Sequence, residues 1–331
     1  MGERLEAQRY IDGILRGDRA MLARAITVVE SELEASAAFS ECILEAILPY
    51  AGKSQRVGIT GAPGVGKSTF IDALGLHLIR DRAERVAVLS VDPSSPFSGG
   101  SILGDKTRMQ RLAAEANAFI RPSPARGHPG GVSRHTREGI LLCEAAGYQN
   151  ILVETVGVGQ SETAVRSMTD FFLLLISPGG GDELQGMKRG IIEMVDGIAI
   201  NKADGENEAV AEGTRTEYVN ALRLFPAGAD DWSAEVRTVS SLTGKGIAEI
   251  WDVILRHRRA REANGSFAQN RSAQALKWMR ELVFDGMQRR FQADPDPEAK
   301  FALLERGVET GDISPCRAAR EFIAAWFNER R

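Results

Sequence analysis

The alternation of apolar and polar positions divides the chain into three parts. Apolar residues recur with the helical period near the N-terminus, where Gly17 interrupts them and Asp18 is placed to cap the next helix. Short apolar runs alternate with helical patterns through the middle, and the pattern is helical again near the C-terminus. We therefore expect three domains: a helical N-terminal extension (1–52), an α/β domain (53–262) and a helical C-terminal arm (263–331).

Seven apolar runs in the middle part have the length and composition of buried strands. They cover residues 56–60, 85–91, 118–121, 150–155, 170–176, 196–201 and 235–240. Because helical patterns separate them, we expect a mostly parallel central sheet flanked by helices on both faces, with ligands at the carboxyl ends of the strands. The longest strongly apolar run, Phe171–Ile176, is far too short to span a membrane and is typical of a central strand.

A stripe of apolar residues follows one face of a predicted helix in the C-terminal arm and stops at Asp294. The stripe contains Leu276, Met279, Leu282, Val283, Met287 and Phe291. Ser314 and Pro315 then have the order of a helix cap and a first-turn proline, and predict a last helix that bears Phe322. These apolar faces lie outside the α/β domain, so they pack either back on the same chain or against a second copy in a homodimer.

One loop has the G-x-x-x-x-G-K-S spacing of a phosphate-binding P-loop. It consists of Gly61, Ala62, Pro63, Gly64, Val65, Gly66, Lys67 and Ser68, and Thr69 follows. A predicted strand precedes the loop and a predicted helix from Lys67 to about Arg80 follows it, which is the context that the motif needs. Glycines let backbone N–H groups turn toward phosphates, and the helix N-terminus adds partial positive charge. We expect Lys67 to contact the β- and γ-phosphates and Ser68 to ligate Mg²⁺.

A second motif, N-K-x-D, identifies the base. It contains Asn201, Lys202 and Asp204, at the end of a predicted strand. The Asp204 carboxylate can accept hydrogen bonds from N1–H and the 2-amino group of guanine, whereas adenine would leave it unmatched. The pair of motifs therefore predicts a P-loop GTPase domain. A later loop resembles the S-A-K-type loop that closes over guanine, although an ordinary strand-to-helix connection explains it nearly as well; it contains Ser240, Ser241 and Leu242.

Three acidic residues occupy positions at which contacts with Mg²⁺ and the γ-phosphate are expected: Asp92, Asp105 and Glu154. Mg²⁺ prefers an octahedral shell of oxygen ligands, and such carboxylates can supply one or two of them directly or through water. Glu154 begins an E-x-x-G motif whose Gly157 N–H can bond the γ-phosphate and be released after hydrolysis. No glutamine directly follows Gly157, so we expect slow intrinsic hydrolysis that a partner accelerates.

A glycine-rich loop follows the most apolar strand, at the edge of the sheet where the nucleotide is expected. Three consecutive glycines at 179–181 give it many conformations. Its charged and amide residues are candidates for reporting the nucleotide state to a partner, unless the loop is only a flexible connection. The candidates are Asp182, Glu183, Gln185 and Lys188.

Composition narrows the setting of the protein. The 331 residues carry a net charge of −4, so nothing points to nucleic acid or an anionic membrane as a partner. The three cysteines are scattered, as in a reduced cytoplasmic protein, and the N-terminal residues contain no apolar signal region. Neither these cysteines nor the four histidines have the spacing of metal ligands, which disfavours a GTPase that delivers metal ions.

The motifs together resemble those of a known family, the MeaB/ArgK group of metallochaperone-type GTPases, which includes the human methylmalonic aciduria type A protein. The resemblance covers nearly the whole chain and is closest to bacterial MeaB. It is carried by G-A-P-G-V-G-K-S-T (61–69), V-D-P-S-S (91–95), G-G-S-I-L-G-D-K-T-R-M (99–109), E-T-V-G-V-G-Q-S-E (154–162), G-D-E-L-Q-G (181–186) and N-K-A-D (201–204).

The resemblance implies a chaperone of adenosylcobalamin-dependent methylmalonyl-CoA mutase that uses GTP to gate cobalamin delivery and to protect and reactivate the mutase. It implies a homodimer made by the C-terminal arm, and a glycine-rich loop that senses the mutase. By the same resemblance Lys67, Ser68 and Thr69 bind phosphate and Mg²⁺, Asp92, Asp105 and Glu154 surround the metal, Asn201, Lys202 and Asp204 bind guanine, and Gln185 and Lys188 lie in the coupling loop.

Two functions of other classes compete with this interpretation. A P-loop kinase of transport proteins would need an acceptor cleft and ATP, and a binding module without hydrolysis would not need the Mg²⁺ carboxylates. The sequence also contains no D-x-H-x-x-G element of the kind that ligates cobalamin in carrier domains. We therefore expect this chain to act on a partner that holds cobalamin, without holding it tightly itself.

Overall fold

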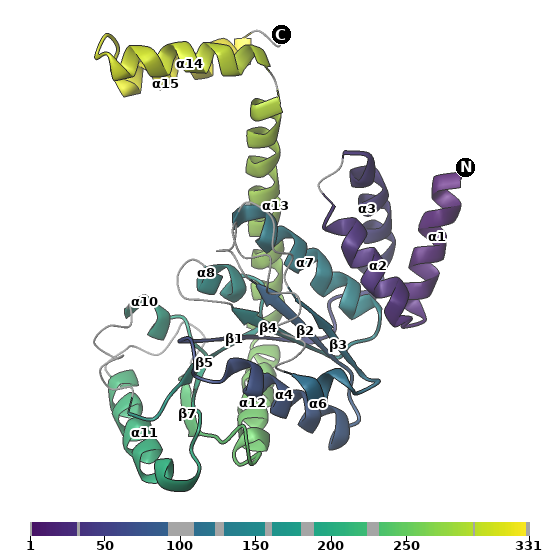
Figure 1. Ribbon diagram of the computed structural model, residues 1–331, viewed down its shortest axis with the longest axis vertical. Helices are drawn as coiled ribbons and strands as arrows, with labels where there is room; N and C mark the ends of the chain where they lie inside the picture. The colour runs from purple at the N-terminus through teal and green to yellow at the C-terminus, as the bar shows by residue number, and fades with distance from the viewer. Residues whose placement is uncertain are drawn as a thin grey trace. The chain divides into compact units, whose positions relative to one another are not determined.

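The computed structural model describes residues 2–31, 34–91, 109–122, 129–155, 161–179, 189–223, 232–293 and 295–328. The chain forms two compact units, Met1–Gln274 and Ala275–Arg331. The first contains the sheet and most of the helices, and the second is helical (Figure 1). None of the helices within the described ranges is both long and apolar enough to cross a membrane.

A seven-stranded sheet forms the centre of the first unit. Its strands are β1 (Gln55–Gly61), β2 (Val86–Val91), β3 (Ala118–Arg121), β4 (Asn150–Thr155), β5 (Phe171–Ile176), β6 (Gly197–Ile200) and β7 (Glu235–Thr238). They lie in the order β3-β2-β4-β1-β5-β6-β7, and every strand pair is parallel. All seven expected strands are confirmed, and so is the α/β class, because each crossover between parallel strands needs a connection over a face of the sheet.

Helices cover both faces of the sheet (Figure 1). One face carries α4 (Lys67–Arg80), α6 (Gln110–Ala113) and α12 (Ile247–Ala263); the other carries α7 (Pro129–Ala145), α8 (Ser161–Arg166) and α11 (Glu208–Leu222). Two short helices, α10 (Arg189–Ile192) and η2 (Gly205–Asn207), border β6. Side chains of each strand alternate between the two cores: in β2, Val86 and Val88 pack with α4, whereas Ala87 and Leu89 pack with α7.

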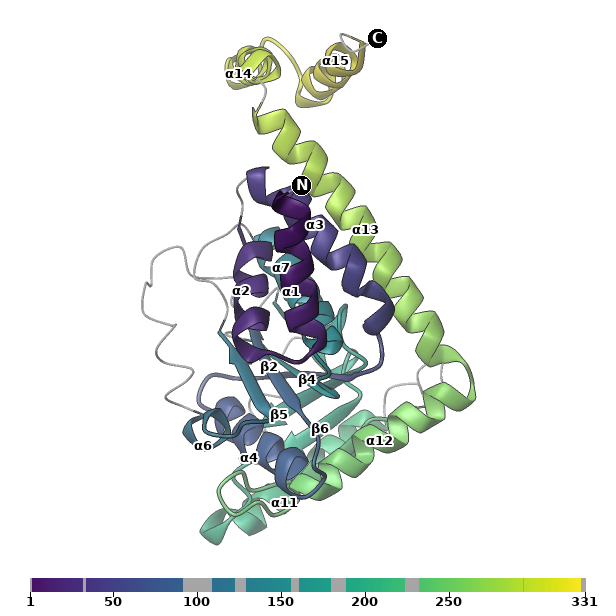
Figure 2. The same cartoon turned by 90° about the vertical axis from the view of Figure 1, so that its right-hand side faces the viewer.

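Three N-terminal helices pack against α7: α1 (Gly2–Leu15), α2 (Arg19–Val29) and α3 (Glu34–Ile47) (Figure 2). Asp18 caps α2 as expected, because its carboxylate accepts from the N–H groups of Ala20 (2.8 Å) and Met21 (3.1 Å). Although the apolar pattern of the N-terminal part includes Leu5 and Leu48, both side chains are exposed. Leu5 lies in the first turns of α1, and Leu48 begins a short turn in which Pro49 ends α3.

The first turns of α13 (Ser266–Ala293) are held in the first unit by buried polar contacts. The Arg271 guanidinium donates to both carboxylate oxygens of Asp170 and to the Ser54 carbonyl (2.9 Å). The Gln274 amide donates to the Thr169 carbonyl at 2.8 Å. Asp170 and Gln274 are both buried, so the root of this helix is fixed by paired polar groups rather than by apolar packing alone.

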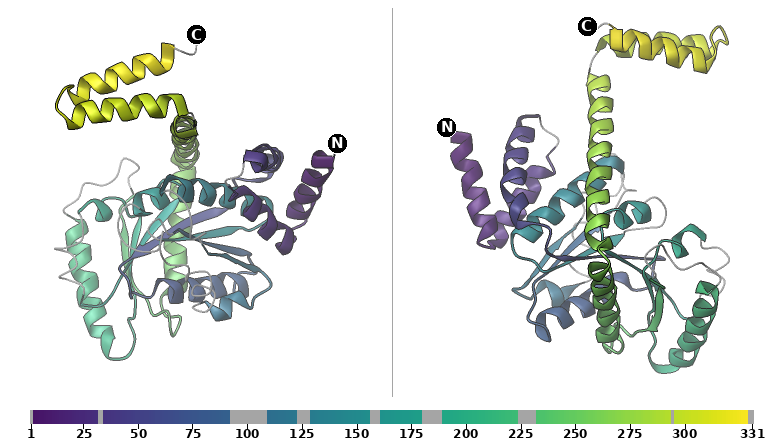
Figure 3. Two further views of the ribbon diagram at one scale, coloured as in Figure 1. Left: turned by 45° about the horizontal axis from the view of Figure 1, so that its top comes forward. Right: turned by 180° about the vertical axis from the view of Figure 1, so that it is seen from behind.

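The second unit contains two neighbouring helices, α14 (Pro295–Glu309) and α15 (Pro315–Asn328) (Figure 3). Phe291, Phe301 and Phe322 meet edge to face, with ring centroids 5.1–5.5 Å apart. Ser314 caps α15 as expected, by accepting from Arg317 N–H. Helix α14 was not expected from the sequence, although Pro295 is tolerated in a first helical turn, where the missing N–H would have no intrahelical partner.

Candidate nucleotide-binding site

The P-loop connects β1 to α4, and its glycines adopt backbone conformations that other residues rarely reach. Gly61, Gly64 and Gly66 have φ angles of 152°, 82° and 94°. A Cβ at Gly61 would lie 2.5 Å from the Leu175 carbonyl oxygen, and a Cβ at Gly66 would lie 2.8 Å from the Asn201 amide nitrogen. The motif glycines are therefore required by local strain and by close approach of the neighbouring β5 and β6 ends.

Lys67 lies inside the curve of the loop. Its ammonium donates to the carbonyls of Gly61 (2.7 Å) and Ala62 (3.3 Å). Burial lowers the pKa of Lys67, and the charges of Glu154 and Glu162 partly oppose this effect. The two carbonyl contacts hold the Lys67 side chain at the P-loop, next to the N-terminus of helix α4. Of the remaining loop residues, Val65 is buried, whereas Pro63 and Gly64 are exposed.

The P-loop serine contacts one of the expected metal carboxylates. The Ser68 hydroxyl donates to Glu154 Oε1 at 3.2 Å, and Glu154 is buried near the carboxyl end of β4. A hydroxyl and a carboxylate are hard oxygen donors, so this pair fits Mg²⁺. Asp92, Asp105 and Gly157 lie outside the described residues, within which no cluster of three His, Cys, Asp or Glu side chains is found.

The base motif meets the P-loop through its first two residues. The Asn201 amide donates to the Val65 carbonyl at 2.9 Å, although the two residues are 136 positions apart in the chain. Lys202 has a positive φ of 60° and donates from Nζ to the Gly64 carbonyl at 2.8 Å. The strand ends of β1 and β6 therefore bring the two sequence motifs into one site.

The loop that contains Ser240, Ser241 and Leu242 forms hydrogen bonds with the base motif. Asn201 Oδ1 accepts from the Ser241 hydroxyl (2.7 Å) and from its N–H (3.2 Å). The Ser240 hydroxyl donates to Asp204 Oδ2. Both serines are buried, whereas Leu242 is 75 % exposed. The structure thus places Ser240 and Ser241 in contact with the N-K-x-D residues, as the comparison with an S-A-K-type loop suggested, and leaves Leu242 at the surface.

The proposed coupling residues Asp182, Glu183, Gln185 and Lys188 lie outside the described residues. Described segments on either side of the glycine-rich loop are nevertheless joined by an ion pair and a hydrogen bond. Arg166, at the end of α8, pairs with Asp196 at 3.0 Å, and Asp196 immediately precedes β6. Asp196 also accepts from the Phe172 N–H at 2.9 Å. One carboxylate therefore links the helix that follows the E-x-x-G motif to the strand that follows the glycine-rich loop.

One positioning residue escaped the sequence analysis. Asp72 lies one turn beyond Ser68 on α4, is 4 % exposed, and accepts from Leu112 N–H (2.9 Å) and Arg111 Nε (2.7 Å). It therefore fixes α6, which follows the segment that contains Asp105, to the P-loop helix. The available signal was a lone acid among the apolar residues of α4, because a buried charge needs partners.

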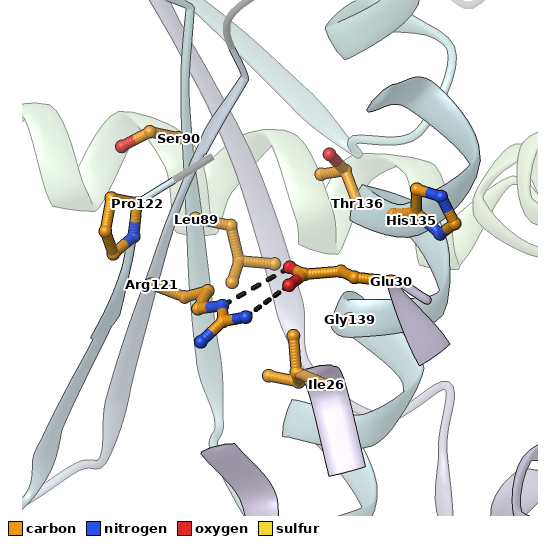
Figure 4. Close-up of a pocket in the computed structure, with 9 residues that line it drawn as sticks. All are labelled: Ile26, Glu30, Leu89, Ser90, Arg121, Pro122, His135, Thr136 and Gly139. Atoms are coloured by element: carbon orange, nitrogen blue, oxygen red, sulfur yellow. Dashed lines mark hydrogen bonds and ion pairs between the residues drawn. The ribbon is translucent and has the colours of Figure 1, made fainter. Parts of the chain in front are cut away.

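A small pocket lies away from these groups, between α2, α7 and the carboxyl ends of β2 and β3 (Figure 4). The Arg121–Glu30 ion pair lies across it. No residue of the P-loop or of the base motif is among those that line it: Ile26, Glu30, Leu89, Ser90, Arg121, Pro122, His135, Thr136 and Gly139.

Comparison with known proteins agrees with this geometry. Residues 22–296 match the family described as methylmalonyl Co-A mutase-associated GTPase MeaB. The chain belongs to the MeaB family. It is a P-loop GTPase with a guanine-nucleotide site, which confirms the family, the fold and the enzyme class expected from the sequence.

Relatives of this MeaB-family chain match it along nearly its whole length. It is 46 % identical to the GTPase ArgK of Escherichia coli, over 93 % of this chain and 94 % of that protein. It is 44 % identical to the mitochondrial methylmalonic aciduria type A homolog of Mus musculus, over 96 % of this chain and 80 % of that protein. A crystal structure described as a LAO/AO transport system kinase superposes with a TM-score of 0.77 at 38 % identity, covering 96 % of both chains.

Proposed function

We propose that this protein is the GTP-hydrolysing chaperone of adenosylcobalamin-dependent methylmalonyl-CoA mutase, gating cobalamin delivery and protecting and reactivating the mutase. The observation that carries the proposal is the Asn201–Val65 contact, which joins a phosphate loop to a guanine motif in a member of a mutase-associated family. A relative that matches nearly the whole chain is named as a methylmalonic aciduria type A homolog, which agrees with this partner.

Within this function the two motifs divide the nucleotide between them. The residues from Gly61 to Thr69 hold the phosphates, and Asn201, Lys202 and Asp204 hold guanine with support from the loop of Ser240, Ser241 and Leu242. Ser68 and Glu154, with Asp92 and Asp105, bind Mg²⁺, which supplies positive charge to the reacting phosphates. Gly157 donates to the γ-phosphate.

Hydrolysis is slow until the partner binds. The contact between Arg166 and Asp196 supports a path by which the segment after Gly157 and the glycine-rich loop move together. In that loop Asp182, Glu183, Gln185 and Lys188 couple the nucleotide to the mutase. A group supplied in trans accelerates GTPases by roughly 10³–10⁵-fold, so a partner contact can control the rate.

The C-terminal arm makes a homodimer in this proposal, and the protein works in the cytoplasm without nucleic acid or membrane as a partner. Exposed apolar residues of α13 support the dimer: Leu276, Met279, Val283 and Met287 are 40–54 % exposed in one chain.

The domain boundaries are 1–52, 53–262 and 263–331. The mutase holds cobalamin, and an absorbance titration in which adenosylcobalamin binds this chain tightly and stoichiometrically contradicts that part.

The alternative of a transport-protein kinase has one observation in its favour, the name of a solved relative. That name describes the other protein, and an ATP-dependent kinase has no use for the paired Asp204 and Ser240 at the base. Delivery of metal ions has no supporting cluster within the described residues.

Complex formation tests the partner. Sedimentation of this chain mixed with the mutase, in GDP and in a non-hydrolysable GTP analogue, should show a complex at micromolar concentrations whose stability differs between the two nucleotides. A GTPase that forms no complex in either nucleotide would retain its enzyme class and lose the proposed partner.

A further inference from the structure

Ser90 is a buried serine whose hydroxyl has no hydrogen-bond partner among the described residues. It is 3 % exposed and lies one residue before the end of β2. Buried polar groups in native proteins are nearly always hydrogen-bonded. An exception calls for an explanation, such as a contact with a water molecule, an ion or a catalytic group. The position of this hydroxyl therefore matters.

The Ser90 side chain faces the P-loop helix. Along β2, Val86 and Val88 pack in the core beneath α4, and the two-residue period of a strand places Ser90 on the same face. Leu89 points the other way. Figure 4 shows Leu89 directed toward the Arg121–Glu30 pair and the Ser90 hydroxyl directed away from it. Ser90 therefore borders the small pocket, while its hydroxyl lies on the α4 side of β2.

Strand register places Ser90 beside the expected metal carboxylate. Ser90 of β2 lies in register with Glu154 of β4. Glu154 in turn lies in register with Ile59 of β1. In-register residues of parallel strands project on the same face, and neighbouring strands lie about 4.8 Å apart. Glu154 already accepts from Ser68 at 3.2 Å. The Ser90 hydroxyl therefore lies on the strand next to this carboxylate, on the same face of the sheet.

We propose that Ser90 is a positioning residue of the Mg²⁺ site: its hydroxyl donates to the Glu154 carboxylate, directly or through one water molecule, when the metal is bound. The inference rests on the proposed GTPase chemistry. Serine donates one proton and the carboxylate only accepts, so the contact is chemically matched. Partners that orient a metal's ligands affect metal affinity by roughly 10–100-fold.

The test compares metal binding by Ser90→Ala, Ser90→Thr and a matched control. The control is Ser40→Ala, because Ser40 is also buried but donates to the Val28 carbonyl, within the N-terminal helices. Each full-length protein is titrated with a fluorescent GDP in EDTA, and its GDP complex is then titrated with Mn²⁺ and followed by electron paramagnetic resonance. Melting temperatures are recorded without metal.

We expect Ser90→Ala to bind Mn²⁺ about tenfold more weakly in the GDP complex, and Ser90→Thr, which keeps the hydroxyl, to recover most of that loss. Metal-free GDP affinity should be unchanged. The melting temperature of metal-free Ser90→Ala should be equal to or above that of the wild type, because the substitution removes an unpartnered buried hydroxyl. Ser40→Ala should leave Mn²⁺ affinity unchanged.

Equal Mn²⁺ affinity in the wild type and Ser90→Ala would overturn the role of Ser90 alone. A lower melting temperature of metal-free Ser90→Ala with no rescue by threonine would overturn it as well, in favour of a structural role. A wild-type chain that binds no GDP would instead remove the proposed nucleotide function, and this inference with it.

Discussion

At the scale of single residues, we propose that Asp204 selects the nucleotide by accepting hydrogen bonds from guanine. Replacing Asp204 with Asn turns one acceptor of the guanine N1–H and 2-amino donors into a donor, and unmatched buried groups cost about 1–3 kcal/mol each. We expect GDP affinity to fall by about 10–200-fold, measured by titration with a fluorescent GDP. Xanthosine diphosphate, whose 2-oxo group accepts, should bind the variant better than the wild type. Unchanged GDP affinity would show that Asp204 does not contact the base.

A buried ion cluster away from the nucleotide site should make stability depend on pH. Glu144 accepts from both Arg56 Nε and Arg56 Nη2 at 2.8 Å and from the Ser54 hydroxyl, and its side chain is 1 % exposed. Burial raises the pKa of Glu144, but Arg56, Ser54 and Arg271 outweigh this effect and hold the pKa below its usual range. Since the folded pKa is lowered, the carboxylate stabilises the fold above its unfolded pKa of about 4.3, and this contribution is lost as pH falls through the folded value.

Glu144→Gln tests this expectation. At pH 7 the variant should lose about 3 kcal/mol of unfolding free energy, because Arg56 is left buried without its charge partner. The difference between variant and wild type should shrink as the pH falls below about 4.3. Urea unfolding of the variant and the wild type, at pH 7 and at a pH below about 4.3, measures this difference in unfolding free energy. A difference that is the same at both pH values would mean that the Glu144 charge is not responsible.

At the scale of elements, two P-loop glycines allow the cost of backbone strain to be distinguished from the cost of a steric clash. Gly64 and Gly66 both have positive φ, but a Cβ at Gly64 meets nothing within 4 Å, whereas one at Gly66 meets the Asn201 amide. Alanine at either site costs roughly 1–2 kcal/mol of backbone strain. Gly66→Ala should also displace Asn201 from Val65. We expect its GDP affinity to be at least about tenfold below that of Gly64→Ala, since tenfold corresponds to 1.4 kcal/mol.

Equal losses in the two alanine variants, measured by GDP titration with urea unfolding as a check on folding, would contradict the coupling between the P-loop and the base motif. The comparison is informative because the two positions share the same loop and the same type of substitution.

Elements with strong periodic patterns could be predicted from the sequence, because their burial dictates the pattern. All seven strands, helix α4 and the Asp18 cap were recovered in this way. Helix α14 was missed, since its two early prolines resemble a helix stop although a first turn tolerates them. The contacts of Asp72 and Ser90 depend on which faces meet in three dimensions, and no local pattern encodes them.

The site was predictable where a motif fixes both residue type and backbone. The P-loop and N-K-x-D residues fall together because both follow parallel strands that end at one edge of the sheet. Support by Ser240 and Ser241 was only suggested, because a serine pair between a strand and a helix is common in loops. The expected roles of Asp92, Asp105, Gly157 and the coupling residues stay predictions.

At the scale of the whole molecule, the exposed stripe on α13 predicts self-association. Val283 is 53 % exposed, so burying the rest of its side chain contributes about 0.8 kcal/mol or more in each of two copies, and a buried glutamate would add a larger desolvation cost. We expect a dimer at tens of micromolar by analytical ultracentrifugation. Val283→Glu should weaken it by at least about 100-fold. Lys277→Glu, a charge change at an exposed site on the same helix, is the control. A wild-type monomer at the same concentration would contradict the dimer.

The proposed function is tested most directly by steady-state hydrolysis of GTP and ATP by the purified protein, with and without methylmalonyl-CoA mutase. We predict slow turnover of GTP only, raised by the mutase at least about tenfold, with roughly 10³–10⁵-fold as the most that a group supplied in trans contributes. Hydrolysis of GTP at a rate indifferent to the mutase would contradict the chaperone function, and a preference for ATP would contradict the assignment of Asp204 as well.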